Sequence, residues 1–217
     1  MENEELKAIA AQLRQPHGSK GIQVSDMMHE SNINMTRQTI KTLELSANEE
    51  VLELGHGNAG HLQYLFEIEK TVRYYGLEIS ELMHAEAKQI NKSFADHKQA
   101  FFFMYDGMDM PFGNDYFDKG YTVNTLYFWE EPVKMLQEIY RVMKPEGIFS
   151  IGFAQKSFME QLPFTQFGFT LYDTKTAEAL VAKTDFNLVK SETQVEQIKG
   201  KIGGMLSREF TILTLKK

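Results

Sequence analysis

The sequence predicts an α/β domain on a doubly wound, mostly parallel sheet, preceded by a helical lead-in. Two observations support this fold class. From residue 49 onwards, strand-like apolar runs alternate with segments of helical periodicity, and such alternation produces parallel strands joined by right-handed crossovers. The first of these strands also ends in a glycine-rich loop that opens a helix. The 217 residues suffice for one such domain with a small cap, but not for a second full core.

Residues 1–48 are expected to form the lead-in, a helical cap on the main domain. The first helix stops where Gln15 precedes Pro16, because the residue before a proline disfavours helical geometry. The predicted elements are, in order, a helix over 4–13, a turn-rich linker over 16–21, and helices over 22–28 and 35–45 separated by Ser31 and Asn32.

Residues 49–217 are expected to form the main domain. Its first strands are predicted from apolar runs rich in β-branched and aromatic residues, at 51–54, 72–77, 100–104, 117–123 and 148–153. Helical periodicity predicts the helices between them, at 60–70, 81–94 and 132–143.

The last part of the chain departs from strict alternation. Residues 154–171 are aromatic and irregular, and a helix is predicted over 175–184. Two longer strands, over 186–197 and 207–215, close the chain. The connection over 199–204 is too short for a helix, so this final pair is predicted to be antiparallel.

The composition is that of an acidic protein without disulfides. The chain has 30 acidic and 23 basic residues, a formal net charge of -7, and no cysteine. A nucleic-acid partner is disfavoured, because such proteins usually present a basic surface. No apolar run reaches the ~20 residues that span a bilayer, and the acidic N-terminus is unlike a secretion signal, so a cytoplasmic location is expected. No spacing of His, Asp and Glu predicts a metal site.

A carboxylate just before the glycine loop gives the first indication of a ligand. Glu53 would lie beside any ligand that this backbone approaches closely. It would repel a pyrophosphate by roughly 1–4 kcal/mol at about 4 Å, but would attract an ammonium and a sulfonium. The pattern therefore indicates S-adenosyl-L-methionine rather than NAD, and the alternative is a turn with no ligand. The loop has the form G-x-G-x-x-G and comprises Gly55, His56, Gly57, Asn58, Ala59 and Gly60.

The second predicted strand also ends in an acidic residue, Glu78, which Ile79 follows. An acid at this point can accept hydrogen bonds from both ribose hydroxyls of a nucleoside. The spacing fits NAD equally well, so it supports an adenosine-containing ligand without choosing between the two cofactors. The alternative is that Glu78 only caps the helix that begins near Ser80.

A third acidic residue, Asp106, follows the third strand together with Gly107 and Met108. Asp106 can accept a hydrogen bond from the exocyclic amine of adenine, while Gly107 and Met108 offer backbone and a soft apolar surface. Ligands of doubly wound sheets bind outside the carboxyl ends of the strands. Glu53, Glu78 and Asp106 are therefore expected along one rim, although an acidic turn is the alternative for Asp106.

Aromatic residues crowd the end of the fourth predicted strand, where a methyl acceptor would approach. Asn124 is expected to contact the methionine end of the cofactor or the acceptor. Tyr127, Phe128 and Trp129 fit core or cap packing equally well. His29 lies in the lead-in and is a candidate general base if the lead-in covers the site, although single histidines are more often structural or exposed.

These motifs together resemble those of the class I S-adenosylmethionine-dependent methyltransferases, over residues 49–217. Residues 51–60 are similar to the family's glycine motif, Glu78 to its ribose-binding acid and Asp106 to its adenine-side acid. Residues 116–118 with Asn124 resemble the fourth-strand motif. The run RVMKPEG at 141–147 resembles the R-V-L-K-P-G-G signature and is most similar to the ubiquinone/menaquinone-biosynthesis-like subgroup, which methylates small molecules.

The resemblance implies a Rossmann-like, seven-stranded sheet of order 3-2-1-4-5-7-6 with strand 7 antiparallel. It also implies S-adenosyl-L-methionine as cofactor and a small-molecule methyl acceptor as partner, and it leaves the oligomeric state open, a homodimer included. Two positions depart from the family pattern. Ala59 replaces the third glycine of G-x-G-x-G and is expected to narrow the loop, and Glu146 replaces the first of two glycines in the later signature.

The leading hypothesis is a methyltransferase that aligns a small-molecule acceptor with an electrophilic methyl carbon. The lead-in and residues 154–171, with their four phenylalanines, are expected to form the lid and acceptor pocket, although packing explains these aromatics equally well. Two alternatives stay open. One is a protein that binds S-adenosylmethionine but transfers nothing. The other is an NAD-dependent oxidoreductase, against which Glu53 and the antiparallel ending argue.

Overall fold

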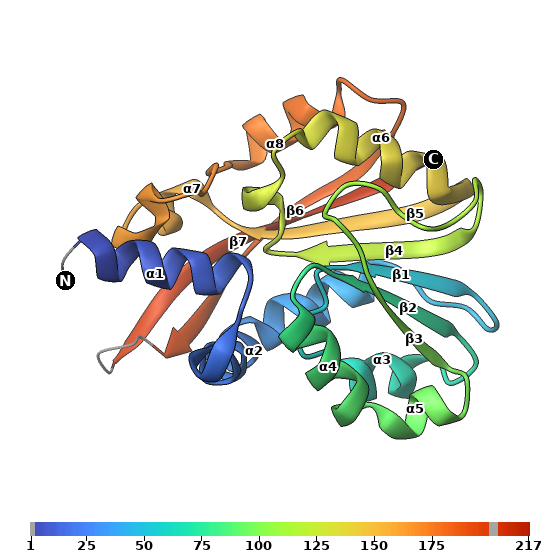
Figure 1. Cartoon of the computed structure of the whole chain (residues 1–217). Coiled ribbons are helices and arrows are strands. Elements are labelled where there is room, and N and C mark those ends of the chain that lie inside the picture. Colours follow the sequence, from blue (N-terminus) through green and yellow to red (C-terminus); the bar gives the residue numbers. More distant parts are fainter. Residues whose placement is uncertain (1–2, 200–203) are drawn as a thin grey trace.

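A computed structural model describes residues 3–199 and 204–217, in which seven strands form a single sheet (Figure 1). The strands are β1 (Glu50–Leu54), β2 (Arg73–Glu78), β3 (Ala100–Met104), β4 (Phe117–Val123), β5 (Met143–Ala154), β6 (Asn187–Lys199) and β7 (Met205–Lys216). Their order is β3-β2-β1-β4-β5-β7-β6. The first five strands are parallel, and β7 is antiparallel to both of its neighbours. The predicted order and the antiparallel strand 7 are confirmed.

Helices cover both faces of this sheet (Figure 1). Buried residues of α6 and α8 pack on one face, and buried residues of α2, α3 and α4 pack on the other. The helices are α1 (Asn3–Arg14), α2 (Gly18–Lys41), α3 (Leu62–Ile68), α4 (Glu81–Ile90), α5 (Lys92–Asp96), α6 (Pro132–Val142), α7 (Lys156–Met159) and α8 (Thr174–Val181), with short 3-10 turns η1 (Leu126–Phe128) and η2 (Pro163–Gln166).

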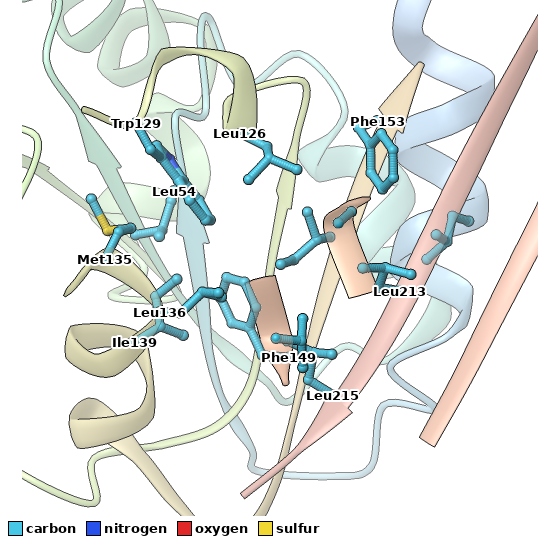
Figure 2. Close-up of a cluster of buried hydrophobic side chains, with 14 of the residues drawn as sticks. Leu54, Leu126, Trp129, Met135, Leu136, Ile139, Phe149, Phe153, Leu213 and Leu215 are labelled. Carbon is cyan, nitrogen blue, oxygen red and sulfur yellow. The ribbon is translucent and has the colours of Figure 1, made fainter. Parts of the chain in front are cut away.

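The larger core lies between the sheet and α6. Leu54 of β1 and Phe149 of β5 meet Leu136 and Ile139 of α6 in this cluster (Figure 2). All five residues of β1 are buried, as expected for a central parallel strand covered on both faces. This packing fixes the carboxyl end of β1, where the glycine loop begins.

The lead-in contains one long helix where two were predicted. Residues 18–41 form the continuous helix α2, and Ser31 and Asn32 do not interrupt it. The hydroxyl of Ser31 donates to the carbonyl of Met28 at 3.1 Å, and the amide oxygen of Asn32 accepts from Arg208 at 2.9 Å. Both polar side chains are thus satisfied within the helix or by a distant strand, so they need not break the helix to find partners.

The glycine in the first turns of α2 permits close packing on α4. A Cβ added at Gly21 would lie 2.5 Å from Cδ2 of Leu82. The linker that was predicted over 16–21 is shorter in the structure, because α2 already begins at Gly18. The linker contacts the segment after β2, because the hydroxyl of Ser80 donates a hydrogen bond to the carbonyl of Pro16 at 2.5 Å.

A buried ion pair holds the middle of α2 against the C-terminal hairpin. Arg208 of β7 pairs with Glu196 of β6 at 2.6 Å, and both side chains are less than a tenth exposed. The same guanidinium donates to the carbonyl of Ser31 at 2.6 Å and to Asn32 at 2.9 Å. These bonds set the position of α2 above the carboxyl ends of the strands.

The helix predicted over 81–94 is two helices, α4 and α5, divided at Asn91. This residue has φ -103° and ψ 25°, outside the helical region. Its side-chain amide donates to the carbonyl of Ala59 at 3.1 Å, so it ties the break to the glycine loop. The predicted connection over 199–204 lies outside the described residues, apart from its two ends.

Candidate functional site

A cleft with a volume of about 300 Å³ opens at the carboxyl ends of β1 to β4, beneath α1 and α2. This size falls at the lower end of the range for small-molecule sites. The predicted site residues that line it are Glu53, Gly55, His56, Gly57, Asn58, Glu78, Ile79, Asp106, Gly107, Met108 and Asn124. Gly60 does not line the cleft, and a Cβ added to it would lie 3.0 Å from Cε1 of His29. One cleft therefore gathers residues from four strand ends.

The two glycines of the loop have different roles. Gly55 has φ +70°, and a Cβ there would lie 2.4 Å from Cγ2 of Thr125, so only glycine fits. Gly57 has φ +55° and no atom within 4 Å of such a Cβ, so its backbone faces open space in the cleft. A ligand can therefore approach this backbone closely. Ala59, also at positive φ, is fully buried and does not line the cleft, and the narrowing of the loop by its methyl group stays a prediction.

Glu53 is buried and accepts three hydrogen bonds on one oxygen. The hydroxyl of Tyr121 donates to Oε2 at 3.0 Å, Nε2 of His61 lies 2.9 Å from the same atom, and the hydroxyl of Tyr74 donates to it as well. Burial acts to raise the pKa of Glu53, but the charge and hydrogen bond of His61 and the bond from Tyr74 outweigh it, so the pKa lies below its ordinary value. Glu53 is therefore an ionised group at the floor of the cleft.

The second oxygen of Glu53 is available to a ligand. Among the described residues, none donates a hydrogen bond to Oε1, and this side chain lines the cleft. The arrangement leaves one carboxylate oxygen facing the cleft while the other is fixed from behind. An ammonium donor fits such an acceptor, because a hydrogen bond to an ionised group is stronger than one between neutral groups.

Glu78 is buried against three backbone amides. Its Oε2 accepts from Gly57 at 2.9 Å, and its Oε1 accepts from Ile79 at 2.8 Å and Ser80 at 3.0 Å. Burial raises the pKa of Glu78, and these three amides offset part of the rise. The residue that caps α4 is Ser80, whose side chain accepts from the amide of Met83, so the alternative of Glu78 as the helix cap is wrong.

Asp106 lies in an exposed turn at the edge of the cleft. Its Oδ1 accepts from the amides of Met108 at 2.9 Å and Asp109 at 2.8 Å. These two bonds lower the pKa of Asp106 below its usual value. Gly107 follows with φ +92° and turns its backbone past Ile79. Asp106 therefore lines the cleft, as predicted, and also forms the acidic turn that was the alternative.

Asn124 closes the far side of the cleft from the end of β4. Its φ of +57° is in the left-handed region, which asparagine tolerates better than most residues. Its Oδ1 accepts from the hydroxyl of Tyr127 at 3.0 Å and from the amide of Ala154 at 3.3 Å. Tyr127 is buried and does not line the cleft, whereas Phe128 and Trp129 line it and also belong to or pack on the core.

His56 lies beneath the loop as a neutral side chain. Its Nδ1 contacts the carbonyl oxygen of Gly57 at 2.6 Å, and its Nε2 is buried without a partner among the described residues. Burial, opposed in part by the charge of Glu53, lowers the pKa of His56 to about 4. The ring packs edge-on to Phe102, so it supports the loop from the core side.

The lead-in supplies a roof whose members the sequence did not single out, apart from His29. Arg14, the last residue of α1, forms an exposed ion pair at 2.8 Å with Glu130, which follows η1. Helical spacing alone could have indicated which face of α2 points down, but not that it covers a cleft. The cleft-lining residues of the lead-in are Leu13, Arg14, Pro16, Ser25, Met28, His29, Asn32 and Thr36.

Residues 154–171 do not line the cleft, so their predicted role in the acceptor pocket is wrong. Phe158 and Phe164 are buried. Phe169 packs on Phe128 with ring centroids 4.6 Å apart and on Phe164 at 5.9 Å, while Phe167 lies beneath the ammonium of Lys7. Apolar packing draws these rings behind the cleft wall, where they support Phe128.

Within residues 3–199 and 204–217, no group of three or more His, Cys, Asp or Glu could hold a metal ion. No helix of this described part of the chain is long and apolar enough to cross a membrane.

Known proteins resemble this chain in sequence and in fold. Residues 52–151 match a family described as a methyltransferase domain. An uncharacterized methyltransferase of Bacillus subtilis, YdaC, is 27% identical over 121 residues, which are 56% of this chain and 65% of that protein. The erythromycin 3''-O-methyltransferase of Saccharopolyspora erythraea is 24% identical over 127 residues, covering 58% of this chain and 41% of that protein.

The fold likeness extends over the whole chain. The crystal structure of a SAM-dependent methyltransferase from Aquifex aeolicus superposes with a TM-score of 0.66 at 16% identity, covering 100% of this chain and 98% of that one. The two curated relatives, in contrast, are matched over less than two thirds of their own length. None of these comparisons selects the ubiquinone/menaquinone-like subgroup, which stays a prediction. The chain thus contains a stretch that matches a methyltransferase domain, and its fold is similar to that of solved methyltransferases.

Proposed function

We propose that this protein binds S-adenosyl-L-methionine in the cleft and transfers its methyl group to a small-molecule acceptor. The observation that carries the proposal is the set of three carboxylates on one cleft beside an open glycine backbone. Glu53 offers Oε1 to an ammonium, Glu78 and Asp106 follow at the next two strand ends, and Gly57 leaves room for a ligand. This charge pattern suits a cationic nucleoside and disfavours a dinucleotide pyrophosphate.

We assign each predicted site residue a role from its position in the fold. Glu53 would hold the ammonium of the cofactor, Glu78 the ribose hydroxyls and Asp106 the adenine amine. Gly55, His56, Gly57, Asn58 and Gly60 would shape the loop along the methionine chain, Ile79, Gly107 and Met108 would flank the adenine, and Asn124 would contact the methionine end or the acceptor. When bound, the cofactor supplies an electrophilic methyl carbon and a neutral leaving group.

The chain itself would mainly align the acceptor and exclude water. In this proposal residues 1–48 form the cap and residues 49–217 the cofactor-binding domain. The roof from α1 and α2, with Phe128 and Trp129 opposite, would hold the acceptor. The relative that methylates erythromycin is an O-methyltransferase by name, which is consistent with a small-molecule acceptor for this chain.

Calorimetry and product analysis test this proposal. We expect S-adenosylmethionine and S-adenosylhomocysteine to bind and NAD to give no heat. Incubation with methyl-labelled cofactor and the low-molecular-weight fraction of a cell extract is expected to release S-adenosylhomocysteine and a labelled product. Binding without any release would favour a protein that binds the cofactor but transfers nothing, and binding of NAD alone would refute the proposal.

A further inference from the structure

We infer that His29 is the general base of this cleft and that the acceptor is a small molecule whose nucleophilic oxygen or nitrogen arrives protonated. The inference rests on the proposed function and deepens it, because it names a catalytic residue and a substrate class. A thioether would need no such base, because its sulfur carries no proton to lose. His29 lies on α2, in the roof of the cleft.

The ring of His29 lies directly over the glycine loop. A Cβ added at Gly60 would lie 3.0 Å from its Cε1 and 3.3 Å from its Nδ1, so the ring packs against this backbone. The side chain is half-buried and lines the cleft. Among the described residues, none hydrogen-bonds to either ring nitrogen. A polar ring that faces a cleft without a protein partner is available to bind a ligand.

The other histidines and carboxylates of the cleft each have at least one partner within the protein. Glu53 and Glu78 each accept three hydrogen bonds from behind. Glu130 is paired with Arg14 at 2.8 Å. Asp106 accepts two amides, His56 contacts the carbonyl of Gly57, and His61 contacts Glu53 and Tyr121. Of the histidines and carboxylates that line the cleft, His29 alone has no such partner among the described residues.

The surroundings of His29 favour its neutral, basic form. Burial lowers its pKa most, and the charge of His61 lowers it further. On its own helix Arg37 lowers the pKa, while Asp26 and Glu30 raise it in part. The net pKa lies below 6.5, so the imidazole is unprotonated at neutral pH. A base of this kind can accept a proton near the operating pH.

A fixed helix turn holds His29 in place. Asn32 is three residues further along α2, so it shares the face of His29, and both line the cleft. The Arg208 guanidinium donates to Asn32 at 2.9 Å and to the carbonyl of Ser31 at 2.6 Å. This turn is therefore anchored to the sheet, which restricts the motion of the base relative to the cleft.

A hydroxyl acceptor reacts by direct attack of its oxygen on the methyl carbon. The acceptor oxygen forms a bond to the methyl carbon as its proton passes to the free ring nitrogen of His29. The electron pair of the broken C–S bond remains on sulfur, which loses its positive charge. The imidazolium then gives its proton to water. A protonated amine acceptor first gives one proton to His29, and the imidazolium passes it to water. The freed lone pair of the nitrogen then forms the bond to the methyl carbon, and the methylated product keeps its remaining protons as an ammonium.

The test compares His29→Asn and His29→Ala with the wild type and with a control, His84→Ala. His84 is also partly buried with a lowered pKa but does not line the cleft. Each variant is incubated with methyl-labelled S-adenosylmethionine and the low-molecular-weight fraction of a cell extract. We expect both His29 variants to lose about 10²-fold or more in kcat at pH 7, with unchanged affinity for S-adenosylhomocysteine. The control should keep its activity.

Further readouts separate a base from a structural residue. The kcat of the wild type should fall as pH decreases through the pKa of His29, and this acid limb should vanish in His29→Asn. Added imidazole should restore part of the activity of His29→Ala. In the wild type saturated with S-adenosylhomocysteine, the NMR titration of the His29 ring should give the same pKa. The carbon-13 shift of the transferred methyl group distinguishes an oxygen from a nitrogen acceptor.

The outcomes distinguish this inference from the proposed function. If His29→Asn transfers methyl groups within threefold of the wild type with the same pH profile, His29 is not the base, while the methyltransferase proposal stands. A methylated carbon or thioether in the product would overturn the acceptor class. If the wild type binds neither S-adenosylmethionine nor S-adenosylhomocysteine, both the proposed function and the inference fail.

Discussion

Replacing Glu53 with glutamine tests the electrostatic design of the cleft. Three donors, from His61, Tyr74 and Tyr121, converge on Oε2 of Glu53. In Glu53→Gln the amide oxygen must take this position, because the amide nitrogen cannot accept these bonds. The NH₂ group would then occupy the place of Oε1 and face the cleft. An acceptor that carries negative charge becomes a neutral donor, with almost no change in shape.

The size of the effect follows from the bond that is lost. A hydrogen bond to a charged group contributes about 1.5–3 kcal/mol, which corresponds to a loss of about 10- to 150-fold in affinity. We therefore expect Glu53→Gln to raise the Kd of S-adenosylmethionine by this factor. Tyr121→Phe is the matched control, because it removes one donor to Oε2 but keeps the charge and the free oxygen. Its Kd should change by less than about threefold, since the ligand contact itself is intact.

Isothermal titration calorimetry measures both variants, and circular dichroism confirms that they are folded. If Glu53→Gln binds S-adenosylmethionine within threefold of the wild type, the free oxygen of Glu53 makes no contact with the ammonium. Equal losses in the two variants would mean that the network acts through the shape of the cleft and not through the charge of Glu53.

Three further predictions concern the loop, the anchor and acid stability. Gly55→Ala should lower the free energy of unfolding by about 1–2 kcal/mol or more, because φ at this position is positive and the added Cβ would meet Thr125; thermal melting measures this loss. Gly57→Ala should mainly weaken the binding of S-adenosylhomocysteine, which calorimetry measures. Arg208→Met leaves a buried carboxylate without its cation and should cost about 3–5 kcal/mol in urea unfolding, and an unchanged midpoint would contradict this. His56 has a pKa of about 4 in the folded state against ~6.5 in the unfolded state, so the unfolded chain binds more protons between these pH values. The free energy of unfolding should therefore fall by about 2 kcal/mol between pH 7.5 and 5. Urea unfolding of His56→Asn should lack this loss.

Local patterns predicted the strands and the carboxylates at their ends, because these depend on residues close in sequence. Glu53, Glu78 and Asp106 each follow an apolar run, and parallel strands bring such positions to one edge. The antiparallel ending followed from a connection too short for a helix.

Contacts between distant segments explain what the sequence did not reveal. His61, Tyr74 and Tyr121 come from a loop and two strands, and only the folded sheet places their donors on one oxygen. Ser31 and Asn32 have the composition of a helix break, but they bond to the chain one turn back and to Arg208, so the helix continues. The aromatic residues of 154–171 indicated a pocket, yet burial drew them into the wall behind it.

The anchor of α2 has a consequence for the order in which the protein matures. Arg208 lies 176 residues after Asn32 and 177 after Ser31. During synthesis the roof helix therefore leaves the ribosome long before its anchor. Contacts of such long sequence separation form late, because closing the intervening loop costs entropy before the contact can repay it. A nascent chain can therefore hold the five parallel strands β1 to β5 while the acceptor side of the cleft is still unassembled.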